Sequence, residues 1–465
     1  MTLADEIIQG RHPRFEAYVQ ACDSLDDIDE YGFTPLIETI IMHRLELTVE
    51  LIKLGVDINT PDMAGRTALQ WAVDNEDKPA LELLLQHHAD PNRFTLQGFS
   101  ALVYPILRQD EAIKQLLLKH GANLNFAQDF IAAKLLGHRF SLTGSTDLVT
   151  PHGDMIEIDY EGFVLEFTLG VIKNSFTRFM HHFSARKWQA ETAIASQIIQ
   201  ALANADKLLR LQRSSKPKRG FDDALVAMLQ QELLILPAAS SGHAMGFIKY
   251  QNWLIKIDRG ENSLKEGSIN VYEIGKMQAF NAHFLDAFMF KRQPRQFFHE
   301  SIQQMLNLTK ISTLPMSSQI SGNCSWANME ACIAVSHWVI SCYPDVHFEP
   351  RKSGLFYQSW LKWDQDRAIE EIITVLPKAS KARQLSLASM LAAVLFQFLN
   401  ASIVADTDRA ERILKTIVQE NVVYILQSYL DVYCETGQKT FHGDNLLQLL
   451  DNCGYDPNQL GLMFS

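Results

Sequence analysis

The sequence predicts a multi-domain α and α+β protein, with an N-terminal solenoid of helical repeats, a central α+β domain and a helical C-terminal region. Two short motifs recur together every 33 residues near the N-terminus. Alternating apolar patterns typical of strands follow, and nearly everything after about residue 355 has helical patterning. Because 465 residues exceed one ordinary domain, we expect three regions, spanning 1–140, 145–350 and 351–465.

The N-terminal region is defined by its repeat. One motif, Gly-x-[Ser/Thr]-x-Leu, begins at Gly32, Gly65 and Gly98, and a second motif ending in Asn closes each unit at 55–59, 88–92 and 121–125. Two motifs that keep one period indicate a stacked repeat array. The pattern resembles the ankyrin consensus, which implies clear repeats near 30–62, 63–95 and 96–128, behind a degenerate cap over residues 1–28.

Local chemistry supports helices inside each repeat. The Thr34 hydroxyl can cap a helix N-terminus, and Pro35 suits the first helical turn. Gly55 and Gly121 suit the left-handed position that follows a helix end. We expect residues 126–140 to pack on the last repeat.

Ankyrin repeats imply that the N-terminal region binds another protein. We expect exposed finger tips and the inner helices to carry the contacts, so the candidate partner-binding residues are Asp62, Met63, Trp71, Gln97, Phe99 and Tyr104. Trp71 could equally be a core residue.

The central region alternates between strand and helix patterns. We expect paired strands within 155–168 and a helical stretch over 175–212. Further strands are expected over 245–258, around a Gln251-Asn252 turn, and over 268–275. A turn-rich loop then leads to a helix that begins near Cys324.

Four residues of this region suggest thiol chemistry. A helix N-terminus and a nearby imidazole lower the pKa of a cysteine thiol, so Cys324 is a candidate nucleophile and His243 its base. A chain running out along one strand and back along the next can return Asp258 to the side of His243, where it would orient the ring. The Gln319 amide could stabilise a developing oxyanion.

This constellation resembles that of papain-fold cysteine proteases, in which a Gln precedes a Cys that opens a helix and an aromatic residue, here Trp326, follows. The order His, Asp, Gln, Cys is that of the circularly related ubiquitin-like-protein proteases and of bacterial effectors that share their core. The resemblance implies acyl transfer, such as peptide or isopeptide cleavage. The alternative is a non-catalytic scaffold that retains the fold, with Cys324 an ordinary buried thiol.

Ankyrin repeats joined to such a core resemble the ankyrin-repeat effectors that Legionella injects through a type IV secretion system. This resemblance implies a protein acting on host proteins, in the host cytoplasm or nucleus. The N-terminus lacks the apolar core of a signal peptide, which agrees with that expectation. The basic stretch 213–220 (RSSKPKRG) resembles a short nuclear-localisation signal but also a solvated loop.

Composition and motif content argue against several other classes of function. A net charge of −12 argues against non-specific nucleic-acid binding, and six cysteines without a CxxC pair argue against a disulfide scaffold. We expect no cofactor: the histidines lack zinc-ligand spacing with cysteines, and no phosphate-binding glycine motif is present. His337, Cys332 and Cys342 are expected in the core.

The C-terminal region reads as helical throughout. Residues 384–405 are uncharged and long enough to span a bilayer, but their polar content favours a buried helix over a membrane span. Residues near 440–460 resemble a further ankyrin-like unit. The alternative is a plain helix that ends at Gly454.

Overall fold

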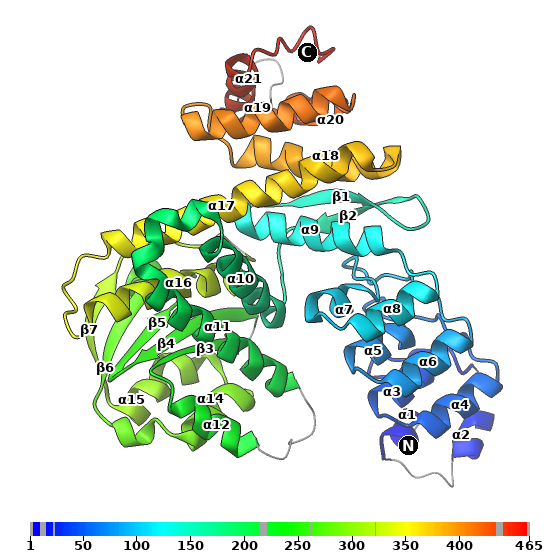
Figure 1. Ribbon diagram of the computed structural model, residues 1–465. Helices are drawn as coiled ribbons and strands as arrows, with labels where there is room; N and C mark the ends of the chain where they lie inside the picture. Colours follow the sequence, from blue (N-terminus) through cyan, green and yellow to red (C-terminus); the bar gives the residue numbers. More distant parts are fainter. Residues whose placement is uncertain are drawn as a thin grey trace.

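The computed structural model describes residues 3–9, 15–21, 24–213, 221–240, 242–260, 263–320, 322–433 and 440–462. Along the chain, a stack of helix pairs is followed by a domain built on a sheet and then by a group of helices (Figure 1). This arrangement confirms the predicted multi-domain α and α+β class. The predicted nuclear-localisation stretch lies outside the described residues, apart from Arg213.

The N-terminal stack consists of short antiparallel helices: α1 (Leu3–Gln9), α2 (Phe15–Ala21), α3 (Pro35–Ile41), α4 (Leu45–Lys53), α5 (Ala68–Asp74), α6 (Lys78–Gln86), α7 (Val103–Arg108) and α8 (Glu111–Lys119). The Thr34 side chain accepts a hydrogen bond from the Ile37 amide, as expected of a cap. Gly55 and Gly121 have φ values of +87° and +88°, which a side chain would strain. The local predictions for the repeats are therefore confirmed.

Helix α9 (Leu124–Phe140) continues the stack and connects it to the rest of the molecule. Its Phe126 and Phe130 rings pack against Phe94 and Phe99 of the last repeat, as the sequence predicts. The chain then forms a two-stranded hairpin of β1 (Ser145–Val149) and β2 (Met155–Asp159). The expectation of paired strands within 155–168 is wrong beyond Asp159, since residues 160–164 form no strand and α10 (Leu165–Met180) follows.

The central domain contains an antiparallel sheet whose five described strands run in sequence order: β3 (Leu233–Ser240), β4 (His243–Tyr250), β5 (Trp253–Ile257), β6 (Ile269–Ile274) and β7 (Leu308–Leu314). Its helices are α10, η2 (Phe183–Glu191), α11 (Thr192–Arg213), α12 (Phe221–Leu229), α13 (Ser263–Glu266), η3 (Met277–Ala279), α14 (Ala282–Phe290), η4 (Phe297–Ser301), α15 (Ile302–Leu306) and α16 (Cys324–Cys342). The predicted strands β4, β5 and β6 are confirmed.

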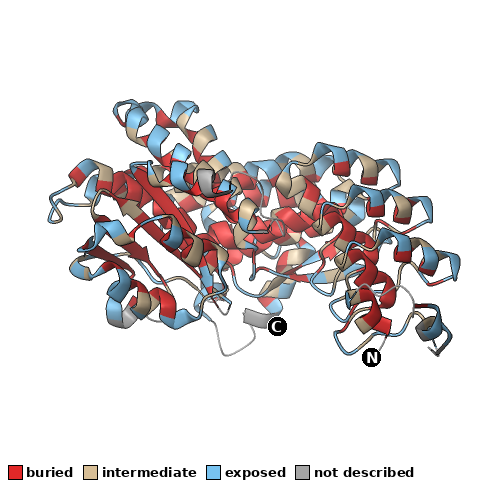
Figure 2. Ribbon diagram, turned by 90° about the horizontal axis from the view of Figure 1, so that it is seen from below, coloured by how far each residue is buried: buried red, intermediate tan, exposed pale blue. Residues whose placement is uncertain are grey.

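Helices cover both faces of this sheet. On one face, Trp253 of β5 stacks on Trp338 of α16. On the other, Phe247 of β4 packs edge-on against Phe288 of α14. Strands covered on both faces need continuous apolar runs, and β5 is buried at every position. Figure 2 shows this buried layer in red, with exposed residues on the outer helix faces.

The C-terminal region packs on α9 and the β1–β2 hairpin. It comprises α17 (Arg351–Val375), η5 (Leu376–Lys378), α18 (Lys381–Gln397), α19 (Val404–Gln419), α20 (Tyr424–Tyr433) and α21 (Phe441–Asn452). The uncharged segment forms α18, which is buried along most of its length. None of the described helices meets the length and hydropathy needed to cross a bilayer. Gly454 follows α21 with φ +76°, and an ankyrin-like unit here stays a prediction.

Candidate functional site

The β4–β5 hairpin brings His243 and Asp258 together. Gln251 has φ +50° at its turn, and the register pairs Gly246 with Ile257, so Asp258 follows directly on the side of His243. The His243 Nε2 atom donates to Asp258 Oδ1 at 2.8 Å. Gly260 lies beside the ring, where a Cβ would come within 2.8 Å of His243 Cε1. The hairpin therefore fixes the ring from two sides.

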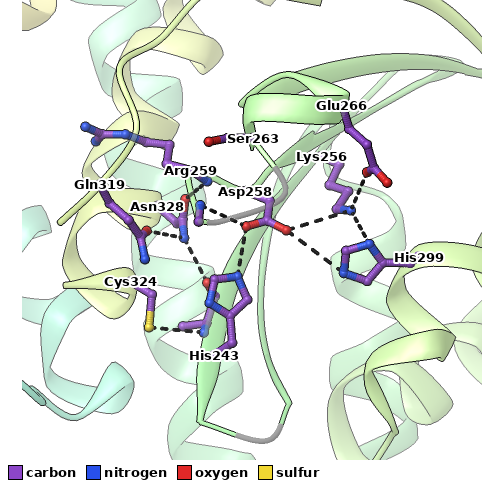
Figure 3. A network of polar contacts seen from close by, with 12 residues as sticks. His243, Lys256, Asp258, Arg259, Ser263, Glu266, His299, Gln319, Cys324 and Asn328 are labelled. Carbon is purple, nitrogen blue, oxygen red and sulfur yellow. Dashed lines mark hydrogen bonds and ion pairs between the residues drawn. The ribbon is translucent and has the colours of Figure 1, made fainter. Parts of the chain in front are cut away.

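Helix α16 delivers Cys324 to the same place. Cys324 is its first residue, and the helix approaches β4 closely because Gly246 has no side chain: a Cβ there would meet Cys332 Sγ at 3.1 Å. The Ala244 amide donates to Cys324 Sγ at 3.3 Å. In Figure 3 the His243 ring lies between the Asp258 carboxylate and the Cys324 sulfur. The structure thus brings together three predicted residues that are far apart in the chain.

The electrostatics of these groups favour a thiolate beside an imidazolium. Hydrogen bonds to Asp258 and to Cys324 raise the pKa of His243 to about 9, against the effect of burial. Burial alone would raise the pKa of Cys324, but hydrogen bonds from His243 and the Ala244 amide outweigh it and lower that pKa. Both pKa shifts favour the pair of thiolate and imidazolium over the neutral pair.

Gln319 lies at the other side of the sulfur. Its side-chain oxygen Oε1 accepts a hydrogen bond from Asn328 Nδ2 at 3.2 Å. The Gln319 backbone amide also donates to the Arg259 carbonyl at 2.9 Å. Figure 3 shows the Gln319 amide nitrogen turned toward the Cys324 sulfur.

A second group of polar side chains stands behind Asp258. The Lys256 ammonium lies 3.9 Å from Asp258 Oδ2 and donates to His299 Nδ1 at 2.9 Å. Lys256 also lies 3.8 Å from Glu266 (Figure 3). Burial raises the pKa of Asp258, but the hydrogen bond from His243 and the nearby charges of His243 and Lys256 outweigh it, so the carboxylate stays ionised.

A cleft of about 810 Å³ opens above the sulfur. Its lining includes His243, Gln319 and Cys324, together with Glu161 and Arg295. A smaller groove of about 350 Å³ runs along the inner face of the repeats and is mainly apolar. Gln97 and Gly162 line both spaces, so the groove of the repeats adjoins the cleft above Cys324.

The predicted partner-binding residues divide into two sets. Met63 and Gln97 are exposed at the finger tips, whereas Phe99 and Tyr104 are half-buried and line the inner groove. The expectation of an exposed Asp62 is wrong, since its side chain is 5% exposed.

Asp62 instead holds its own finger together. Its carboxylate accepts hydrogen bonds from the Ala64 and Arg66 amides and from the Trp71 indole. Trp71 is half-buried, with the Arg66 guanidinium stacked 3.9 Å from its ring centroid. Phe99 was also expected to be exposed, but its ring is 4.6 Å from that of Phe130 in the core.

Three residues at the site were not predicted from the sequence. Asn328 stands one helical turn after Cys324, and that spacing could have indicated it. Lys256 and His299 could not be found from sequence, because only the fold brings η4 next to β5. His337, Cys332 and Cys342 are buried as expected. No three or more His, Cys, Asp and Glu side chains in the described part of the chain are grouped to hold a metal ion.

Comparisons with known proteins agree with this architecture. A family model for ankyrin repeats matches residues 43–128 in three copies. Curated relatives named inversin match 65 residues, or 14% of this chain, at 38% identity in Danio rerio and 35% in Homo sapiens. The chain spans about 6% of the length of these relatives.

One solved structure matches the whole molecule. The structure of the Legionella effector AnkH is 45% identical, with a TM-score of 0.84, over 98% of this chain and 98% of that one. Such identity over both full lengths extends far beyond the repeats and includes the sheet domain and the C-terminal helices. The chain belongs to the AnkH family of ankyrin-repeat effectors of Legionella.

Proposed function

We propose that this effector is a thiol acyl-transfer enzyme of papain-like design, with Cys324 as nucleophile, His243 as base, Asp258 as orienting acid and Gln319 as oxyanion donor. The observation that carries the proposal is the position of one imidazole between a carboxylate and a sulfur at a helix N-terminus. A helix start, an antiparallel sheet and an adjoining cleft support the papain-like comparison.

The reaction would begin with attack of the Cys324 thiolate on a carbonyl carbon. The carbonyl π electrons move to oxygen, and the resulting oxyanion is held by the Gln319 amide and by backbone N–H groups at the start of α16. The imidazolium of His243 gives its proton to the leaving amine as the C–N bond breaks, which leaves a thioester. Water, deprotonated by His243, then attacks the thioester carbonyl; the C–S bond breaks, the acid leaves, and the pair of Cys324 thiolate and His243 imidazolium is restored.

The repeats would select the protein on which this chemistry acts. The inner groove and the cleft share Gln97 and Gly162, so a segment of a bound protein can reach Cys324 without leaving the surface. We take peptide or isopeptide cleavage as the reaction. The rival function is a scaffold that only binds, with a cleft that performs no chemistry.

Alkylation with iodoacetamide separates these two functions. We expect Cys324 to react near neutral pH at least tenfold faster than Cys453, a half-buried thiol whose burial raises its pKa. The rate should fall in His243→Ala, because the imidazolium that stabilises the thiolate is lost. Equal rates for Cys324 and Cys453, or a rate indifferent to His243, would support the scaffold.

Binding through the repeats is tested with a matched pair of surface changes. Leu96 at a finger tip and Val404 in the C-terminal region are each 81% exposed. Leu96→Glu should abolish recovery of a host protein from lysate, while Val404→Glu should leave it unchanged. Loss with both variants, or with neither, would refute the assignment of the surface.

The proposed site of action is the host cell, reached through a type IV secretion system. A reporter fused to the chain should enter host cells from bacteria that have the system and not from bacteria that lack it. Fluorescence of the same fusion in nucleus and cytoplasm, with and without residues 214–220, tests the nuclear expectation.

A further inference from the structure

Asn328 occupies the centre of the candidate site. It lies on α16, is fully buried, and reaches β4, the segment after β5 and the loop before α16 (Figure 3). Its Oδ1 accepts from the Arg259 backbone amide at 2.9 Å. Its Nδ2 donates to the Ala244 carbonyl at 2.8 Å and to Gln319 Oε1 at 3.2 Å.

The backbone partners decide which way this amide points. A backbone N–H can only donate and a backbone carbonyl can only accept, so Arg259 and Ala244 fix Oδ1 on one side and Nδ2 on the other. With Nδ2 in place, Gln319 must present its oxygen to Asn328. Its own N–H groups are then left facing the cleft, on the side of the Cys324 sulfur.

We propose that Asn328 is a positioning residue, which fixes the Gln319 amide with its N–H toward the oxyanion of the reaction. This inference rests on the proposed function, since it concerns how one of the assigned groups is oriented. An amide that rotated freely would present oxygen to the oxyanion part of the time and repel it. Asn328 removes that state by hydrogen bonding and touches no reacting atom itself.

Asn328→Asp reverses the polarity with little change of shape. An ionised carboxylate can accept from the Arg259 amide but cannot donate, so Gln319 would turn its N–H groups toward residue 328 and its oxygen toward the cleft. Alkylation by iodoacetamide forms no oxyanion, whereas acylation by p-nitrophenyl acetate does. The two probes therefore separate thiolate reactivity from oxyanion stabilisation.

The experiment measures the burst of nitrophenol and the alkylation rate of Cys324 in the full chain. In Asn328→Asp and in Gln319→Ala we expect acylation to fall by about 10²-fold, the usual effect of losing one oxyanion donor. The alkylation rate of Cys324 should change less than about threefold, which is roughly the uncertainty of comparing a variant with the wild-type chain. The double variant should be no slower than either single variant, because both remove the same hydrogen bond.

Asn445→Asp is the matched control. Asn445 is also buried, accepts from the Ala401 amide and donates to the Leu399 carbonyl, but lies in the C-terminal region. It should lose stability without loss of acylation. If Asn328→Asp does not fold, Asn328→Ala leaves Gln319 unheld and should slow acylation by about tenfold.

Three results overturn the inference in distinguishable ways. Normal acylation in Asn328→Asp and Asn328→Ala, beside an impaired Gln319→Ala, refutes the role of Asn328 alone. Equal losses of acylation and alkylation would make Asn328 only structural. A wild-type chain that shows no burst above that of Cys324→Ala overturns the proposed function and the inference together.

Discussion

At the scale of single residues, neighbours rather than residue type decide what a group can do. A second imidazole also lies between an acid and a potential nucleophile: His337 contacts the Glu191 carboxylate at 3.1 Å and the Ser353 hydroxyl at 2.8 Å. His337 is fully buried, so no substrate can reach it. His243 has similar partners but borders an open cleft. The same chemistry is structural in one place and available for reaction in the other.

The sequence predicted the candidate catalytic residues but not the residues that hold them in place. Cys324, His243, Asp258 and Gln319 were found because their types and order match a known chemistry. The helical spacing from Cys324 could have placed Asn328 near the site, but its contact with Gln319 and the contact of Lys256 with Asp258 are seen only in the folded structure. A resemblance therefore named the candidate reacting groups, while the groups that contact them were found only in the structure.

The pKa of His243 provides the first prediction. Nuclear magnetic resonance titration of the ring should give a midpoint near 9, and Asp258→Asn should lower it, because the hydrogen bond to Asp258 is the largest cause of the raised pKa. Since the folded pKa exceeds the unfolded value of 6.5, stabilisation from this group is complete below pH 6.5 and is lost as pH rises through about 9. An unchanged midpoint in Asp258→Asn would contradict this assignment.

At the scale of elements, long patterns were predicted better than short ones. Residues 163–168 alternate like a strand, but Phe167, Ile172, Phe176 and Phe179 recur at helical spacing and bury one face of α10. The longer period prevails because a helix there covers α11 and α16.

The strands β3 and β7 were not predicted. In β3 the apolar run is continuous, which a buried helix would also show, and Pro237 argues against a central strand. The structure resolves this, since β3 is at the edge of the sheet, where a proline is tolerated.

The close approach of β4 and the segment after β5 provides an element-scale prediction. Gly260→Ala should displace the His243 ring, because the new Cβ would lie 2.8 Å from Cε1. We expect the alkylation rate of Cys324 to fall about tenfold while the melting temperature changes little. Gly354→Ala is the control, since a Cβ there meets no atom within 4 Å and helical alanine is favoured. Equal alkylation in both variants would exclude the proposed contact.

At the scale of the whole molecule, the repeats and the candidate site are connected through α9. His138 of this helix contacts the Asn323 side chain at 2.6 Å, directly before Cys324, and stacks on Trp326. Burial lowers the pKa of His138 to about 4, so the ring is neutral at physiological pH. The sequence predicted that this helix would pack on the last repeat, but its second role, against α16, was visible only in the structure.

A buried carboxylate at this junction provides the whole-molecule prediction. Asp364 of α17 bonds Arg139 of α9 at 2.6 Å and Ser175 of α10 at 2.5 Å. Asp364→Ala should lower the free energy of unfolding in urea by about 3–5 kcal/mol, because it leaves a buried arginine unpaired. Asp366→Ala, two residues away and at a more exposed ion pair with Arg409, should cost about 1 kcal/mol or less. Similar losses of unfolding free energy in the two variants would contradict the importance of Asp364 at this junction.

The central claim is that Cys324 rests as a thiolate paired with the His243 imidazolium. The absorbance of thiolate near 240 nm, taken as the difference between the wild-type chain and Cys324→Ser across pH, tests it most directly. The account predicts one thiolate at pH 7 that is lost in His243→Ala, because the hydrogen bond and the charge of His243, which lower the pKa of the thiol, are then absent. No absorbance difference at pH 7, or a difference that survives removal of the imidazole, would contradict the claim.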